Sequence, residues 1–203
     1  DRGAGPGKAT DPRPGRQWKS YFAIFAEMDR LDYILSGRRM VLILDPGAEV
    51  LLIEPIDAND LDFLDRETGY LKEHYPGPFA LSCFIIEDWN KELTPWKAEA
   101  VIGGQPFGDG AAGTLSFVEG TLLPDLLSRC PGLQGRDVVL GGYSLAALFA
   151  LWAGYESSAF AGIAAASPSV WYPGWIEYAR THRPQAGRIY LTPSLFSLYR
   201  FYW

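Results

Sequence analysis

The sequence predicts an α/β protein with a mostly parallel sheet and helices on both faces of that sheet. Between residues 50 and 191, short aliphatic runs that suit strands alternate with longer segments that suit helices, and such alternation is typical of parallel sheets. Several apolar runs are continuous, as expected of strands covered on both faces. The 203 residues are 48% hydrophobic and 14% aromatic, which is enough for one sizeable core.

The charge and the apolar runs exclude several classes of partner. The formal net charge of -6 argues against nucleic acid as the main partner. No apolar run approaches the roughly 20 residues of a membrane helix, and no secretory signal opens the chain. We therefore expect a cytoplasmic protein without a nucleic-acid or membrane partner. Because no methionine precedes Met28, the chain looks like an excerpt.

Cysteines and histidines are few and lie far apart in the sequence. Cys83 sits in an apolar run and Cys130 lies beside a proline, so we expect both to be free thiols. With only His74 and His182 in addition, no cluster has the spacing of zinc ligands. We expect neither a metal nor a cofactor.

The first half of the chain contains the outer strands. Residues 1–17 combine glycine, proline and charge, which predicts a flexible tail before a single domain over 18–203. Strand-like runs follow at 18–29 and 40–44, and a turn at 45–47 leads into a buried strand at 50–53.

The middle of the chain continues the alternation. A helix begins near Asn59 with acidic residues in its first turn, and Gly77-Pro78 precedes a strand at 79–86. A polar, aromatic loop at 87–96 and a glycine-rich segment at 103–113 lead to a helix over 114–128. A strand at 138–140 comes next.

The rest of the chain is organised around residues 137–153, DVVLGGYSLAALFALWA. Here a short strand meets a turn of small residues, Gly142-Tyr143-Ser144-Leu145-Ala146, and then an apolar helix. Gly-x-Ser-x-small between a strand and a helix is the sequence form of a nucleophile elbow. The elbow raises the Ser144 hydroxyl above the sheet and points the Leu145 N–H at the place where an oxyanion forms.

A simpler interpretation is that Ser144 only caps the helix, since serine is a preferred cap residue. The flanking pattern favours the elbow. Residues 148–152 are apolar nearly all round, as expected of a helix packed on a sheet. Residues 161–166 then form another buried strand.

Three loops converge on Ser144, because ligands bind beyond the carboxyl ends of parallel strands. These loops are residues 54–58, 87–96 and 167–175. Their aromatic side chains either wall an apolar pocket for a small molecule or simply cover the ends of the core. The residues are Trp89, Trp96, Trp171, Tyr172 and Trp175.

Four segments taken together, in order along the chain, resemble small bacterial α/β-hydrolases, closest to the esterases related to esterase D and the enterochelin esterases. The segments are residues 53–57, 88–96, 141–146 and 166–175, and the resemblance runs from about residue 38 to 191. It implies an α/β-hydrolase fold and hydrolysis of a small-molecule carboxylic ester through a serine acyl-enzyme. It assigns Ser144 as the nucleophile, with oxyanion N–H groups from Leu145 and from Ile56.

The resemblance fails at the C-terminal end. In this fold the acid and the histidine of the triad follow the strand that we expect at 188–191, yet no Asp, Glu or His lies beyond residue 182. Glu177 as the acid and His182 as the base are the candidates that follow Ser144 in the right order, but they belong to a helix that we expect at the surface. We therefore expect a C-terminally incomplete, truncated α/β-hydrolase with weak or no activity, since a serine hydroxyl needs a base.

Two other interpretations stay open. The chain is either a noncatalytic binding protein on the same scaffold or one part of an assembly in which a partner supplies the missing histidine. A missing terminal segment would also leave one sheet edge uncovered, and such edges promote self-association into homo-oligomers.

Overall fold

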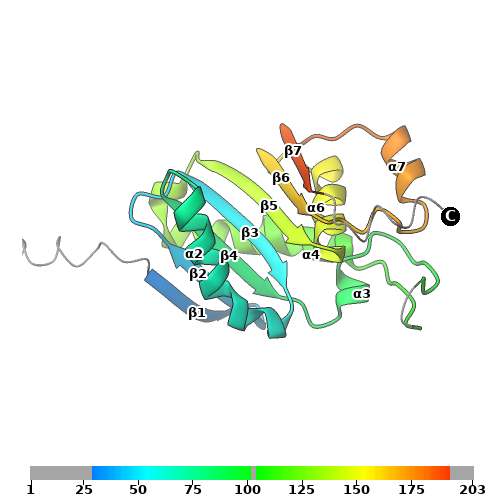
Figure 1. Ribbon diagram of the computed structural model, residues 1–203, viewed down its shortest axis with the longest axis horizontal. Helices are drawn as coiled ribbons and strands as arrows, with labels where there is room; N and C mark the ends of the chain where they lie inside the picture. Colours follow the sequence, from blue (N-terminus) through cyan, green and yellow to red (C-terminus); the bar gives the residue numbers. More distant parts are fainter. Residues whose placement is uncertain (1–28, 102–103, 193–203) are drawn as a thin grey trace, which may run out of the picture.

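The computed structural model describes residues 29–101 and 104–192, and a seven-stranded sheet runs through this part of the chain (Figure 1). The strand order is β1-β2-β4-β3-β5-β6-β7. All neighbours from β4 to β7 are parallel, whereas β1 and β2 add an antiparallel edge. The strands are β1 (Asp29–Leu35), β2 (Arg38–Leu44), β3 (Val50–Ile56), β4 (Phe79–Ile85), β5 (Asp137–Tyr143), β6 (Gly162–Ala166) and β7 (Arg188–Thr192).

The N-terminal hairpin differs from the prediction. Strand β1 covers residues 29–35, which the sequence analysis did not recognise as a strand, and a turn at Ser36-Gly37 connects it to β2. The first four of its seven residues are all exposed. Strand β1 therefore lacks the apolar run by which a strand is recognised in a sequence. The run at 18–28 and the tail at 1–17 lie outside the described residues.

The longer helices lie where the alternation predicts them, but the short helix α3 (Trp89–Glu92) forms within the predicted loop at 87–96. The predicted helix at 114–128 begins at Ala111 and changes to π-helical geometry halfway. Pro124 follows this wider turn and lacks the N–H that an α-helical ladder requires. The helices are η1 (Ala58–Phe63), α2 (Leu64–His74), α3 (Trp89–Glu92), α4 (Ala111–Phe117), η2 (Val118–Leu122), α5 (Leu123–Arg129), η3 (Pro131–Leu133), α6 (Leu145–Glu156) and α7 (Trp175–Thr181).

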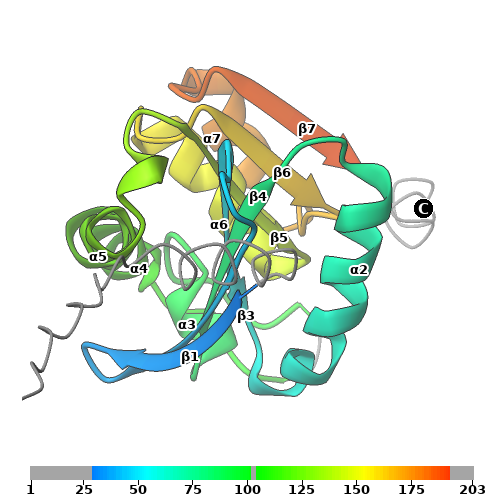
Figure 2. The same ribbon diagram turned by 90° about the vertical axis from the view of Figure 1, so that its left-hand side faces the viewer.

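Helices cover both faces of the sheet, and Figure 2 shows α2 on one side with α4 and α5 on the other. The residues of β4 are all buried, because this strand lies between the two layers. Its odd-numbered residues, such as Leu81 and Cys83, pack with Leu64 of α2. Its even-numbered residues, such as Ala80 and Phe84, join the larger core that contains α6. This arrangement is the predicted α/β fold.

Helix α6 is the centre of the larger core. Ten of its twelve residues are buried, so it is apolar all round rather than amphipathic, as expected of a helix enclosed by other layers. Its buried residues contact β5 and β6, which carry the functional turn at their carboxyl ends. Within the described ranges, none of the helices is long and apolar enough to cross a membrane.

Candidate functional site

The turn between β5 and α6 has the geometry of a nucleophile elbow. Ser144 has φ 58° and ψ -115°, a conformation that a residue with a side chain rarely adopts. The backbone of the following helix passes so close that a Cβ atom on Gly142 would lie 2.7 Å from both the carbonyl carbon and the Cβ of Ala146. Small residues at these two positions are therefore a steric requirement of the turn.

Backbone hydrogen bonds hold Ser144 in this conformation from two sides. Its N–H donates to the carbonyl of Ala166 at the end of β6 (3.1 Å), and its carbonyl accepts from Leu148 in α6 (3.1 Å). The same carbonyl accepts from the N–H of Ser169 (3.1 Å). Since strain at a single residue persists only where its surroundings impose it, this frame explains how the turn keeps its shape.

Ser169 also contacts the side chain of Ser144. The two hydroxyl oxygens are 3.3 Å apart, and Ser169 is only 1% exposed. The sequence analysis did not single out Ser169. A signal was nevertheless present, because the loop at 167–169 follows the strand that comes next after the elbow, and neighbouring parallel strands end at the same edge.

Helix α6 gives the elbow a positive electrostatic environment. Leu145 is its first residue, so the Leu145 N–H has no acceptor within the helix, and the helix dipole places partial positive charge there. Ile56 lies at the carboxyl end of β3, which pairs with β5. The two predicted oxyanion donors therefore lie at the same edge of the sheet, one at the end of β3 and the other at the start of the helix that follows β5.

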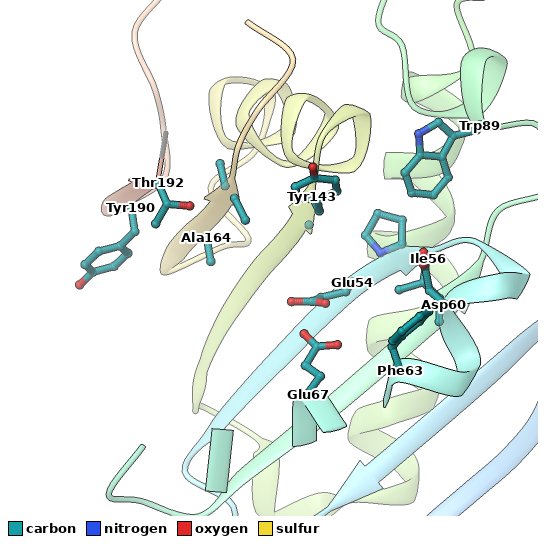
Figure 3. Close-up of a pocket in the computed structure, with 14 residues that line it drawn as sticks. Glu54, Ile56, Asp60, Phe63, Glu67, Trp89, Tyr143, Ala164, Tyr190 and Thr192 are labelled. Atoms are coloured by element: carbon teal, nitrogen blue, oxygen red, sulfur yellow. The ribbon is translucent and has the colours of Figure 1, made fainter. Parts of the chain in front are cut away.

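A cavity of about 410 Å³ opens beside the elbow on the face of the sheet that carries α2 (Figure 3). Its wall combines aromatic rings, small residues and carboxyl groups, and two of the predicted site residues, Ile56 and Trp89, belong to it. Gly142 and Tyr143 also line the cavity, so it extends to the residue directly before Ser144. The remaining lining residues are Glu54, Pro55, Asp60, Phe63, Glu67, Ala164, Ala165, Ala166, Tyr190 and Thr192.

The other four predicted aromatic residues do not line this cavity. Tyr172 is 2% exposed and Trp175 is 4% exposed, so both are core residues. Trp96 packs on Tyr172, with ring centroids 5.7 Å apart, and its indole N–H donates to the carbonyl of Pro173. Trp171 is half-buried and packs on Phe107. These rings hold the loop after β6 on the core.

The loop that carries Trp89 is fixed by a charged network. Glu92 accepts hydrogen bonds from the backbone N–H groups of Glu87 (3.1 Å) and Asp88 (3.0 Å), and it forms an ion pair with Arg38 of β2. Burial alone would raise the pKa of Glu92, but the backbone donors and the Arg38 guanidinium outweigh it and lower that pKa. Trp89 is therefore held by a rigid loop.

Two carboxyl groups, which the sequence analysis also missed, face one another in the cavity. Glu54 projects from β3 and Glu67 from α2 (Figure 3). Burial, together with the charge of Glu67, raises the pKa of Glu54 to about 8, and burial likewise raises the pKa of Glu67. An acidic residue within the apolar strand VLLIEPI was the available signal.

Neither predicted member of an acid and base pair contacts the elbow. His182 is exposed at the end of α7, where its ring stacks on Tyr178 and its Nδ1 lies 2.9 Å from the Tyr178 carbonyl. Glu177 is exposed in the first turn of the same helix. His74 has a similar environment on α2. In residues 29–101 and 104–192, no hydrogen bond joins a histidine to Ser144.

Solved structures with a similar fold include serine hydrolases and siderophore hydrolases. An IroE-like serine hydrolase from Shewanella oneidensis superposes with a TM-score of 0.62 at 20% identity, covering 75% of this chain and 55% of that one. The siderophore hydrolase EstA from Aspergillus nidulans gives 0.57 at 21% identity, covering 85% and 67%. The enterobactin and salmochelin hydrolase IroE gives 0.58 at 16% identity, covering 85% and 88%.

These likenesses establish the α/β-hydrolase fold. The chain spans only about half of the Shewanella protein, and the identities are low. No protein-family model and no curated protein sequence matches the chain.

Proposed function

We propose that the chain is an α/β-hydrolase-fold serine esterase that acts on a small-molecule carboxylic ester, with Ser144 as its nucleophile. The single observation that carries this proposal is the strained, doubly anchored Ser144 at the start of α6, next to a cavity. A helix cap alone would not require this conformation, since cap residues normally have extended backbone angles. The esterases and serine hydrolases among the similar folds support the same chemistry.

The chemistry follows from the elbow. The Ser144 oxygen would attack the ester carbonyl while its proton passes to solvent water, and the resulting oxyanion would accept hydrogen bonds from the Leu145 N–H and the Ile56 N–H. The alcohol would leave, and water would then hydrolyse the acyl-enzyme. The ester's apolar part would occupy the cavity beside Trp89.

Slow turnover is part of the proposal. A serine hydroxyl needs a base to accept its proton, and among the described residues no histidine hydrogen-bonds to Ser144. Proteases that lose their triad retain about 10³- to 10⁴-fold acceleration over water from the oxyanion hole and from binding. We therefore expect the 203-residue chain to retain a weak activity of this kind.

Hydrolysis of p-nitrophenyl butyrate tests the proposal. We expect slow release of p-nitrophenol that falls to the buffer rate in Ser144→Ala and is unchanged in His182→Ala, because His182 lies away from the elbow. The His182→Ala variant is thus the matched control, because it shows whether a substitution at an exposed position away from the elbow changes the activity. Equal rates in the wild type and in Ser144→Ala would refute the assignment, and loss of activity in His182→Ala would identify that histidine as the base.

A noncatalytic binding protein is the second candidate, and the lack of a described histidine contact to Ser144 favours it. Such a protein would bind an aromatic ester in the cavity without turning it over. Trp89→Ala would then weaken binding, because Trp89 lines the cavity, whereas Ser144→Ala would not. Isothermal titration with a non-hydrolysable amide analogue of the ester measures this binding, and a protein that binds the analogue but does not hydrolyse p-nitrophenyl butyrate fits this second candidate.

Self-association through β7 is a further proposal about the assembly. Tyr190 and Leu191 are 60% and 57% exposed on this strand, and within the described residues β7 pairs only with β6. An unpaired edge with exposed apolar side chains favours pairing with a second copy. We expect the apparent mass in light scattering to rise with concentration and Leu191→Lys to abolish that rise. A constant monomeric mass would contradict the proposal.

A further inference from the structure

The strongest unassigned feature outside the elbow is the contact between Glu54 and Glu67. Glu54 lies on β3 and Glu67 on α2, and their carboxyl groups point toward one another across the cavity (Figure 3). Both side chains are only partly accessible to solvent. The pair therefore bridges a helix and the sheet beneath it.

No positive charge neutralises this pair within the cavity. Among the described lining residues none is basic, and Asp60 of η1 adds a further negative charge that acts on Glu67. The thiol of Cys83, on the neighbouring strand β4, faces the same region and is kept neutral because burial raises its pKa. Arg30 bonds to Asp32 and Asp65 and does not line the cavity. Tyr143 and Tyr190 contribute their phenol side chains to the wall.

Ionising both carboxyl groups in this cavity has a high electrostatic cost. Like charges in a poorly solvated site repel each other, and one proton held between the two groups removes the repulsion and supplies a hydrogen bond. Glu54 and Glu67 both line the cavity and face one another there, so a proton on one carboxyl group lies opposite an acceptor on the other. The raised pKa of both groups agrees with this geometry.

We propose that Glu54 and Glu67 share one proton and form a pH-sensitive contact that ties α2 to the sheet beside the nucleophile elbow. This proposal does not rest on Ser144 being catalytic. It assigns a role to two residues that the proposed esterase reaction does not use.

The contact reaches the elbow strand through Gly141. A Cβ atom on Gly141 would lie 2.9 Å from the Oε1 atom of Glu54, so the carboxyl group occupies the space that a side chain at this position would fill. Gly141 is three positions before Ser144 on β5. The Glu54 carboxyl group therefore lies directly beside the strand that leads into Ser144 and, through the proton, is linked to α2.

The pH dependence has a defined sign. Glu54 binds its proton more tightly in the folded protein, where its pKa is about 8, than in the unfolded chain, where it has the ordinary value of 4.5. A raised carboxyl pKa makes the contribution to stability largest below about pH 4.5 and removes it as the pH rises to about 8. Stability should thus fall across the neutral range and then level off.

Two measurements on the full chain test the proposal. In carbon-detected NMR of protein labelled at the glutamate carboxyl carbons, we expect one of the two groups to titrate well above the exposed glutamates. In thermal unfolding between pH 5 and 8.5, we expect the wild type to lose roughly 10 °C more than Glu54→Gln. Glutamine mimics the neutral carboxyl group, so the variant should melt above the wild type at pH 8.5.

Glu73→Gln is the matched control, because Glu73 is an exposed glutamate on the same helix. This variant should keep the pH dependence of the wild type. The proposal is overturned if both carboxyl groups titrate like exposed glutamates, or if Glu54→Gln melts with the same pH dependence as the wild type. If Glu54→Gln does not fold, the NMR titration of the wild type alone decides.

Discussion

Gly142→Ala is expected to lower the free energy of unfolding by about 2–3 kcal/mol and to abolish the reactivity of Ser144. The added methyl group would lie 2.7 Å from the carbonyl carbon and the Cβ of Ala146, and overpacking of this kind costs typically 1–3 kcal/mol. Helix α6 can relieve the clash only by moving away from β5. That movement would displace the Leu145 N–H from the oxyanion position, where errors of about 1 Å cost roughly 100-fold in rate.

Gly69→Ala is the matched control for this substitution. Gly69 lies within α2, and apart from its chain neighbours and the adjacent backbone of the helix no atom lies within 4 Å of the position of an added Cβ. Because alanine is the better helix former by about 1 kcal/mol, Gly69→Ala should leave stability unchanged or raise it. Urea unfolding and p-nitrophenyl butyrate hydrolysis measure the two effects. If Gly142→Ala unfolds like the wild type and keeps its activity, the turn is not the close-packed elbow described here.

The second large effect is expected from Phe149→Ala, at about 3–5 kcal/mol of unfolding free energy. Phe149 is fully buried at the centre of α6, and its ring packs near that of Trp152, with centroids 6.4 Å apart. Removing a buried phenylalanine ring loses its transfer free energy and leaves a cavity that the surrounding core cannot fill. In a chain of this size the melting temperature should drop by roughly 10 °C.

Phe63→Ala removes the same atoms from a residue that is 61% exposed. Its cost should stay below about 1 kcal/mol, because little apolar surface is buried there. Denaturant unfolding of the two variants side by side isolates the effect of burial. A similar loss in both variants would show that α6 is not the centre of the core.

Much of this fold follows from hydrophobic runs, and the exceptions have physical causes. The strands at 50–53 and 79–86 and the helix after Ser144 were predictable because they are largely buried and therefore mostly apolar. Strand β1 was not, because it lies at the edge of the sheet and most of its side chains face solvent. The π-helical segment at 118–122 depends on local backbone geometry that composition does not reveal.

The backbone turn of the candidate site could be predicted from the sequence, but the side chains that surround it could not. Ser144 and the need for small residues around it follow from a local pattern, since the turn involves five consecutive residues. Ser169 and the pair formed by Glu54 and Glu67 depend on contacts between distant segments. Periodicity along one segment does not show which residues meet across the sheet.

The predicted aromatic residues of the site also show that the sequence does not reveal which side chains meet in the folded protein. Trp89 and Trp175 both lie in loops or helices after the carboxyl ends of strands, and the sequence gives no basis for treating them differently. The structure places Trp89 at the cavity and buries Trp175 against Tyr155 and Tyr178. Their difference arises from α7, which folds Trp175 onto α6.

The most direct test of the central claim is the site at which a fluorophosphonate modifies the protein. After prolonged incubation, peptide mapping by mass spectrometry should find one adduct on Ser144 and none on Ser158, an exposed serine just after α6. The reaction should be slow, because no described histidine hydrogen-bonds to Ser144, yet selective, because the elbow orients only this hydroxyl. No adduct at Ser144, or the same labelling in Ser144→Ala, would contradict the assignment of Ser144 as a nucleophile.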